Sequence, residues 1–221
     1  MEALLGSGEF YKLSAMTFRW GHIVFGVTWI GLLYYFNFVQ TEYFKEAEEN
    51  ARKDAVAKLA PRALWWFRWA AFFTFLTGLY LLYAITLRVN LDIIFGVTMG
   101  TFMMLNVWGI IWPNQKIVIG IKEGDAAVAG PKAGLASRTN TLFSLPMLYF
   151  MVSSSHLPHG GYLMVQGDMS STAFLAGILI ILAIQANAIW GKMFGFITSV
   201  RDVIISGFVL TVILSSISYY L

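Results

Sequence analysis

Six long apolar stretches constrain the fold of this chain more than any other feature of its sequence. Each is close to the roughly 20 residues that a helix needs to cross the hydrocarbon core of a bilayer. The alternation of apolar and polar residues that is typical of membrane β-barrel strands is not seen. We therefore predict an all-α integral membrane helical bundle of about six transmembrane helices. They would cover residues 17–40, 63–87, 92–112, 139–156, 171–190 and 203–220.

The composition agrees with this prediction. Hydrophobic residues make up 58% of the 221 residues and charged residues only 12%, whereas about a quarter of the residues in a soluble domain are charged. We expect a single membrane domain over residues 1–221, with a surface segment at 1–16. The chain has no cysteine, which excludes disulfides, iron–sulfur clusters, thiolate metal sites and covalently attached c-type haem.

Lys and Arg are distributed unevenly between the two ends of the predicted helices. Eleven lie in the connections 41–62, 113–138 and 191–202, three lie on the opposite side, and Arg68 lies inside a span. Cytoplasmic connections carry the excess of basic residues in membrane proteins. We therefore expect 41–62 and 113–138 to be cytoplasmic connections in a bacterial inner membrane, with both termini outside.

All three histidines fall near the predicted outer ends of helices. His22 begins the first span, and His156 and His159 follow the fourth. Two facing imidazoles, His22 and His156, would suit a haem b, with Gly26 one turn after His22 leaving room for a flat ring. Two or three imidazoles could also bind copper or zinc. The plainer interpretation is that His22 bonds to a neighbouring helix and that His159 is solvated.

A second group of polar residues is predicted near the cytoplasmic ends of the helices. Side chains of this kind either clamp a small planar polar ligand or hydrogen-bond helices to one another. For Arg68 the alternatives are pairing with an anion and extending to the membrane surface. The candidates for a ligand site are Arg68, Asn114, Gln115, Arg138, Asn140 and Gln185, with Asn37 and Gln40 at a similar depth.

Several segments resemble a known family in matching order. RWGHIVFGVTWIGLLYYFNFVQ, WWFRWAAFFTFLTG, IIWPNQ and ASRTNTLFSLPMLYFMVSSSH are similar to the N-terminal membrane domain of bacterial cytochrome c-linked urate oxidases. The resemblance implies a membrane-bound oxidoreductase of purine breakdown that passes electrons to a c-type cytochrome. The sequence contains no CxxCH haem-attachment motif, so we expect that cytochrome to be a separate protein.

The combined prediction is a redox protein that oxidises urate or a related small molecule and passes electrons through a haem b to a c-type cytochrome. One alternative is a non-enzymatic haem-binding or assembly subunit of a respiratory membrane complex. Another is a small-solute transporter. The expected partners are membrane lipid, a c-type cytochrome, and a second copy of the chain or a larger membrane complex. No feature of the sequence indicates nucleic-acid binding.

Overall fold

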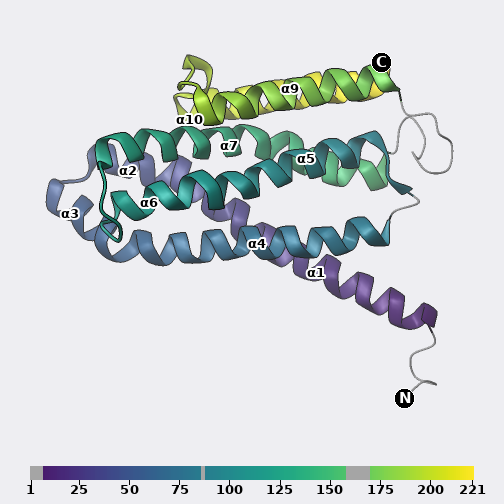
Figure 1. Cartoon of the computed structure of the whole chain (residues 1–221), viewed down its shortest axis with the longest axis horizontal. Coiled ribbons are helices and arrows are strands. Elements are labelled where there is room, and N and C mark those ends of the chain that lie inside the picture. Colours follow the sequence, from purple (N-terminus) through teal and green to yellow (C-terminus); the bar gives the residue numbers. More distant parts are fainter. Residues whose placement is uncertain (1–6, 86–87, 158–169) are drawn as a thin grey trace.

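The computed structural model describes residues 7–85, 88–157 and 170–221, and this part of the chain is helical with no strand. Five continuous helices are long and apolar enough to cross a membrane. They are accompanied by a sixth long helix, α7 (Ala126–His156), which is less apolar. The all-α prediction is confirmed. Figure 1 shows the long helices side by side, with the two ends of the chain at the same end of the bundle.

The first two long helices form a hairpin. α1 (Ser7–Tyr34) continues through a π-helical turn, η2 (Tyr35–Gln40), into α2 (Thr41–Glu46). After extended backbone at Ala47 and Glu48, the chain returns through α3 (Glu49–Asp54), η3 (Ala55–Leu59) and α4 (Ala60–Ala84). The connection 41–62 is therefore mostly helical, because its charged residues extend the two long helices. Exposed ion pairs such as Lys45–Glu42 and Lys53–Glu49 support them at helical spacing.

Two of the π-helical turns directly precede a proline-containing helix start. η3 leads into Ala60–Pro61, and η5 (Val107–Ile111) leads into α6 (Trp112–Val118) with Pro113 in its first turn. Proline lacks an N–H and its ring collides with the carbonyl four residues earlier in a regular helix. A wider turn accommodates that collision. This is why the helix continues through Pro61 rather than ending there.

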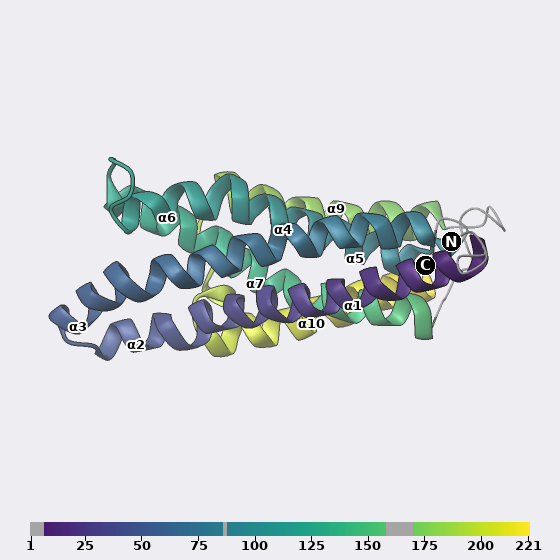
Figure 2. The same cartoon turned by 90° about the horizontal axis from the view of Figure 1, so that it is seen from below.

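The remaining helices pack around α7. α5 (Leu91–Asn106) leads through η5 into α6, and α9 (Ser171–Trp190) is joined through η6 (Gly195–Ile197) to α10 (Val200–Tyr220). α7 contacts α1, α5, α6, α9 and α10. Figure 2 shows α7 between the side formed by α4, α5 and α6 and the side formed by α1 and α10. It is the central helix of the bundle.

The central position of α7 explains why the first half of this helix is polar and resembles a connection in the sequence. Seven consecutive residues, from Arg138 to Ser144, are buried, so no continuous lipid-facing stripe is needed there. The predicted connection 113–138 is wrong in extent, because residues 112–118 form α6 and α7 begins at Ala126. Only a short segment between Val118 and Ala126 joins them. The fourth span is therefore longer and more polar than residues 139–156.

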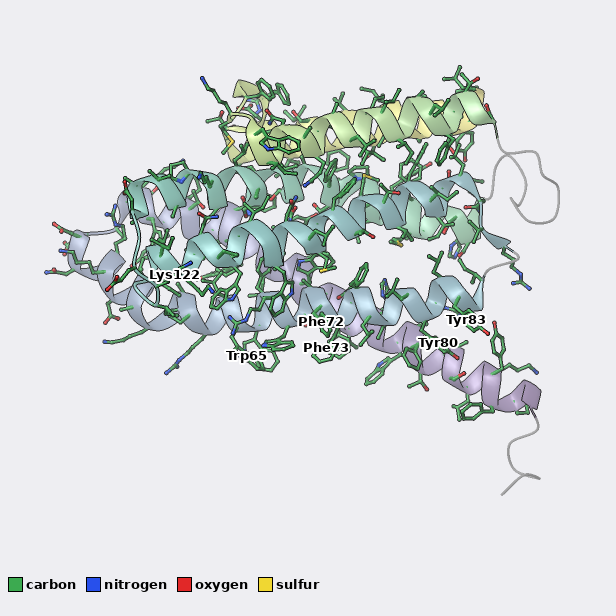
Figure 3. The ribbon with its side chains drawn as sticks, viewed as in Figure 1. Trp65, Phe72, Phe73, Tyr80, Tyr83 and Lys122 are labelled. Carbon is green, nitrogen blue, oxygen red and sulfur yellow. The ribbon has the colours of Figure 1, made fainter. Side chains whose placement is uncertain are left out.

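Aromatic side chains cover the outward face of α4. Figure 3 labels Trp65, Phe72 and Phe73 along α4, and the Phe72 ring meets Trp108 of η5 with centroids 6.3 Å apart. Trp65 is 46% exposed, and the ring of Phe73 stacks on that of Phe25 in α1 with centroids 5.2 Å apart. Exposed aromatic and aliphatic side chains are the expected covering of a helix that faces lipid.

Candidate functional site

A pocket lies among the helix ends that are opposite the chain termini. Its volume is about 300 Å³, and its lining comes from η2, α4, the junction of η5 with α6, the first half of α7, and the segment between α9 and α10. Two of these contributors, η2 and η5, are π-helical turns, which are frequent at functional sites. The pocket therefore collects residues that are far apart in the sequence.

Arg138 is the charged residue of this pocket. Its side chain is only 6% exposed, and the Nη1 atom of its guanidinium is buried without a hydrogen-bond partner among the described residues. The Arg138 guanidinium has an electrostatic interaction with the negative charge of Glu42. The Glu42 carboxylate, however, accepts hydrogen bonds from Lys45 Nζ at 2.8 and 2.9 Å. Burying a charged guanidinium nitrogen without a hydrogen-bond partner costs free energy of folding unless an anion binds to it.

Amide side chains line the pocket beside Arg138. Asn37 is buried, and its Nδ2 donates to Leu33 O at 2.9 Å and to Ser137 Oγ at 2.8 Å. Gln40 and Gln115 also line the pocket, and Gln40 Oε1 is buried without a described partner. The Nδ2 donor of Asn37 is thus occupied by protein contacts, whereas Gln40 Oε1 is a buried acceptor without a described partner.

The walls of the pocket are apolar and flat. Phe36 and Phe67 meet edge to face with ring centroids 5.4 Å apart, and Leu64 and Ile111 lie beside them in the lining. No acidic residue occurs among the lining side chains of the described chain. A cation, an amide oxygen without a described partner and aromatic walls together favour a small planar anion.

Asn140 and Gln185, two of the predicted ligand residues, lie in a separate network. Asn106 Nδ2 donates to Asn140 Oδ1 at 2.8 Å and to Gln185 Oε1 at 3.0 Å, and Gln185 Nε2 donates back to Asn106 Oδ1 at 2.7 Å. Asn140 Nδ2 donates to Met103 O at 2.9 Å. These amides satisfy one another and join α5, α7 and α9. Their side chains hold helices together and are not part of the pocket.

Arg68 and Asn114 are also outside the pocket lining. The Arg68 guanidinium lies over the ring of Trp112, 3.9 Å from its centroid, a cation–π arrangement that connects α4 to α6. Asn114 Nδ2 donates to Ile110 O in the preceding turn at 2.7 Å. Of the six residues predicted for a polar ligand site, the structure therefore places Arg138 and Gln115 together in the pocket.

His22 faces α4. Its Nδ1 lies 2.9 Å from Thr74 O and 3.3 Å from Thr77 Oγ1, and its Cε1 would be 3.0 Å from a Cβ added to Gly78. Gly26 also faces α4, since a Cβ added there would be 3.9 Å from Thr74 Cγ2. The open space that was expected beside Gly26 is occupied by Thr74.

His156 ends α7 and is exposed, with Nδ1 3.0 Å from Val152 O of its own helix. His159 lies outside the described residues. α1 touches α7 through Tyr34, whose hydroxyl is 2.9 Å from Ser144 Oγ, and α1 diverges from α7 toward its N-terminus (Figure 1). The described contacts therefore do not bring His22 and His156 together.

Each imidazole nevertheless has the chemistry of a metal ligand. A ring that donates its Nδ1–H to a carbonyl keeps a lone pair on Nε2, and this arrangement is usual for histidines that bind metals. His22 and His156 both have Nδ1 next to a main-chain oxygen. Their donor atoms fit a haem iron individually, and the shared haem b remains a prediction.

Asp92 is a buried acid whose surroundings the sequence did not reveal. Its carboxylate is 1% exposed and accepts hydrogen bonds from Ser153 Oγ and Ser218 Oγ, each at 2.5 Å. The two serines belong to α7 and α10, so Asp92 joins three helices at the end of the bundle that holds the chain termini. The spacing of these residues along the chain carries no signal for this contact.

Comparison with known families gives one match. The family described as urate oxidase N-terminal matches residues 88–213, which is more than half of the chain. The matched region includes Gln115, Arg138 and His156, and excludes Gln40 and His22. No curated protein and no solved structure matches the chain.

Proposed function

Because the chain belongs to the urate oxidase N-terminal family, we propose that it is a membrane-bound redox protein that binds urate, or a closely related planar anion, in the Arg138 pocket and oxidises it. The observation that carries this proposal is the buried Arg138 guanidinium with an unpartnered Nη1 in a pocket without acidic lining. An anionic ligand supplies the partner that this group lacks.

The properties of urate match those of the pocket. Urate is a flat bicyclic molecule that is anionic near neutral pH and has carbonyl oxygens and N–H groups around its edge. Phe36 and Phe67, which meet edge to face, supply an aromatic wall. The volume of about 300 Å³ is at the lower end of the range for small-molecule sites. Arg138 would orient the ligand through its planar fork of donors.

Oxidation of urate by addition of water forms one C–O bond and releases two protons and two electrons. The protein therefore requires an electron acceptor, and a c-type cytochrome is the acceptor that the family resemblance implies. Haem b, when bound, supplies one-electron redox chemistry at its iron. The described contacts do not bring His22 and His156 together, so each is a candidate for a single iron ligand, with its Nδ1 at a main-chain carbonyl.

The test measures urate binding and urate-dependent reduction of added cytochrome c by the purified chain, with haem supplied during expression. Arg138→Gln removes the charge and should weaken urate binding by about 1.5–3 kcal/mol, or roughly tenfold to a hundredfold. Arg138→Lys should also weaken binding, because a point charge replaces a planar fork.

Arg68→Gln is the matched control. It removes a second intramembrane arginine, whose guanidinium is engaged by Trp112 outside the pocket, so urate affinity should stay at the wild-type value. Equal losses in the Arg68 and Arg138 variants would contradict the proposed binding site. Binding and transport of urate into vesicles without any electron transfer would replace the redox function by that of a transporter.

A further inference from the structure

Two buried atoms of opposite hydrogen-bonding character remain without partners in the same pocket. Arg138 Nη1 is a donor and Gln40 Oε1 is an acceptor, and neither has a hydrogen-bond partner in the described part of the chain. The third such atom, Trp29 Nε1, belongs to a residue that does not line the pocket. Buried polar atoms are usually paired, so two unpaired atoms in one pocket indicate what a ligand must supply.

The backbone around Gln40 explains why its side chain is free. The N–H of Thr41 bonds to Phe36 O, five residues earlier, and Thr41 Oγ1 donates to the same oxygen at 2.7 Å. The π-helical turn is therefore satisfied without the Gln40 amide. In the neighbouring amide of the same turn, Asn37, the donor Nδ2 is occupied by Leu33 O and Ser137 Oγ. Gln40 Oε1 is the buried amide acceptor of this pocket that has no partner among the described residues.

The two unmet requirements select a chemical class. Arg138 needs an oxygen acceptor, and Gln40 Oε1 needs an N–H donor. Ionised carboxylates and sulfate provide acceptors alone, so they would leave the Gln40 oxygen buried and unpaired. Cyclic amides and imides, such as the oxidised purines, carry C=O and N–H groups on one planar ring and satisfy both.

We infer that Gln40 is a specificity-determining residue of this pocket, which accepts a hydrogen bond from a ring N–H of the ligand while Arg138 binds an oxygen of the same molecule. The inference rests on the proposed function, and it narrows the ligand from any planar anion to one with a ring N–H. A site that hydrogen-bonds a ligand group discriminates strongly against analogues that lack it, because its own polar atom is then left unpaired.

The experiment compares urate with its four singly N-methylated forms, measured by calorimetry on the purified full-length chain. Each methyl group replaces one of the four N–H hydrogens of uric acid and leaves the ring otherwise intact. One isomer should bind about tenfold to a hundredfold more weakly than urate because Gln40 then has no donor. Gln40→Met has a side chain of similar size without an amide acceptor. In this variant the penalty for methylation should fall to about threefold or less. Urate itself should bind to the variant at least about tenfold more weakly than to wild type.

Gln40→Glu supplies the complementary variant. A carboxylate at this position would repel an anionic ligand and compete for Arg138, so urate binding should be lost. The thermal unfolding midpoint of each variant, measured without ligand, separates loss of recognition from loss of folding.

The two proposals fail in different ways. If urate binds in an Arg138-dependent manner but the methyl penalties are the same in wild type and in Gln40→Met, the role of Gln40 is wrong and the proposed binding site stands. If wild type binds benzoate or sulfate, which have no N–H or O–H group when ionised, as tightly as urate, the N–H requirement is overturned. If urate does not bind to wild type at all, the proposed function fails and the inference fails with it.

Discussion

At the scale of single residues, the polar side chains of this protein differ by whether protein partners satisfy them. Asn106, Asn140 and Gln185 complete one another's hydrogen bonds. Arg138 Nη1 and Gln40 Oε1 in the pocket have no partner among the residues that the structure describes. The sequence presents all five as polar residues in or near apolar spans. Helix packing alone accounts for the three amides that hydrogen-bond one another, but it does not account for Arg138 and Gln40.

The amide network leads to a prediction about stability. Asn106→Leu should lower the free energy of unfolding by about 1–3 kcal/mol, because it leaves the facing amide groups of Asn140 and Gln185 buried and unpaired. Urate affinity should be nearly unchanged, since Asn106 does not line the pocket. Thermal unfolding and calorimetry of the same sample measure both quantities.

The control for this network is the combined variant with leucine at positions 106, 140 and 185. Replacing all partners removes the unpaired groups together, so this variant should be less destabilised than the sum of its single substitutions. Additive losses would show that the three amides do not act as a unit.

At the scale of helices, close approaches depend on glycine at particular contacts. A Cβ added to Gly177 in α9 would lie 2.1 Å from Cζ of the Phe95 ring in α5. Gly96 of the GxxxG pair in α5 is similarly close to α7, with an added Cβ 3.3 Å from Phe150 Cβ. The Gly177 contact carries no recognisable motif in the sequence.

Gly177→Ala should therefore destabilise the bundle by about 1–3 kcal/mol, because the fully buried Phe95 ring has to move. Gly31→Ala is the matched control in α1, where an added Cβ meets no atom within 4 Å. That substitution should leave the thermal midpoint unchanged or raise it slightly, since alanine favours a helix over glycine by about 0.5–1 kcal/mol. Equal effects of the two substitutions would argue against the α5–α9 contact.

At the scale of the whole molecule, the basic residues and the chain termini separate to opposite ends. Ser7 and Leu221 lie at one end of the bundle, and α2, α3 and α6 lie at the other (Figures 1 and 2). The helix order is consistent with the predicted topology. Which end faces the cytoplasm remains a prediction from the distribution of Lys and Arg.

Single cysteines test that orientation without background labelling, because the natural sequence has none. A membrane-impermeant thiol reagent added to intact spheroplasts should label Tyr220→Cys, at a position 85% exposed, and should leave Lys53→Cys unlabelled until the membrane is opened. The reverse pattern would invert the topology. Labelling of both positions from outside would contradict a membrane-spanning bundle.

The sequence by itself determined the all-α membrane architecture, the order of the spans and the family. These properties follow from local hydropathy and from segments that are contiguous in the chain, so no knowledge of packing is required. The tertiary structure decided the extent of α7, because a central helix needs no apolar stripe toward lipid and its polar first half looked like a connection. It also decided which polar residues form a site. Arg138, Gln40 and Gln115 come from three different elements, and whether a buried polar atom is paired depends on the helix faces that meet around it.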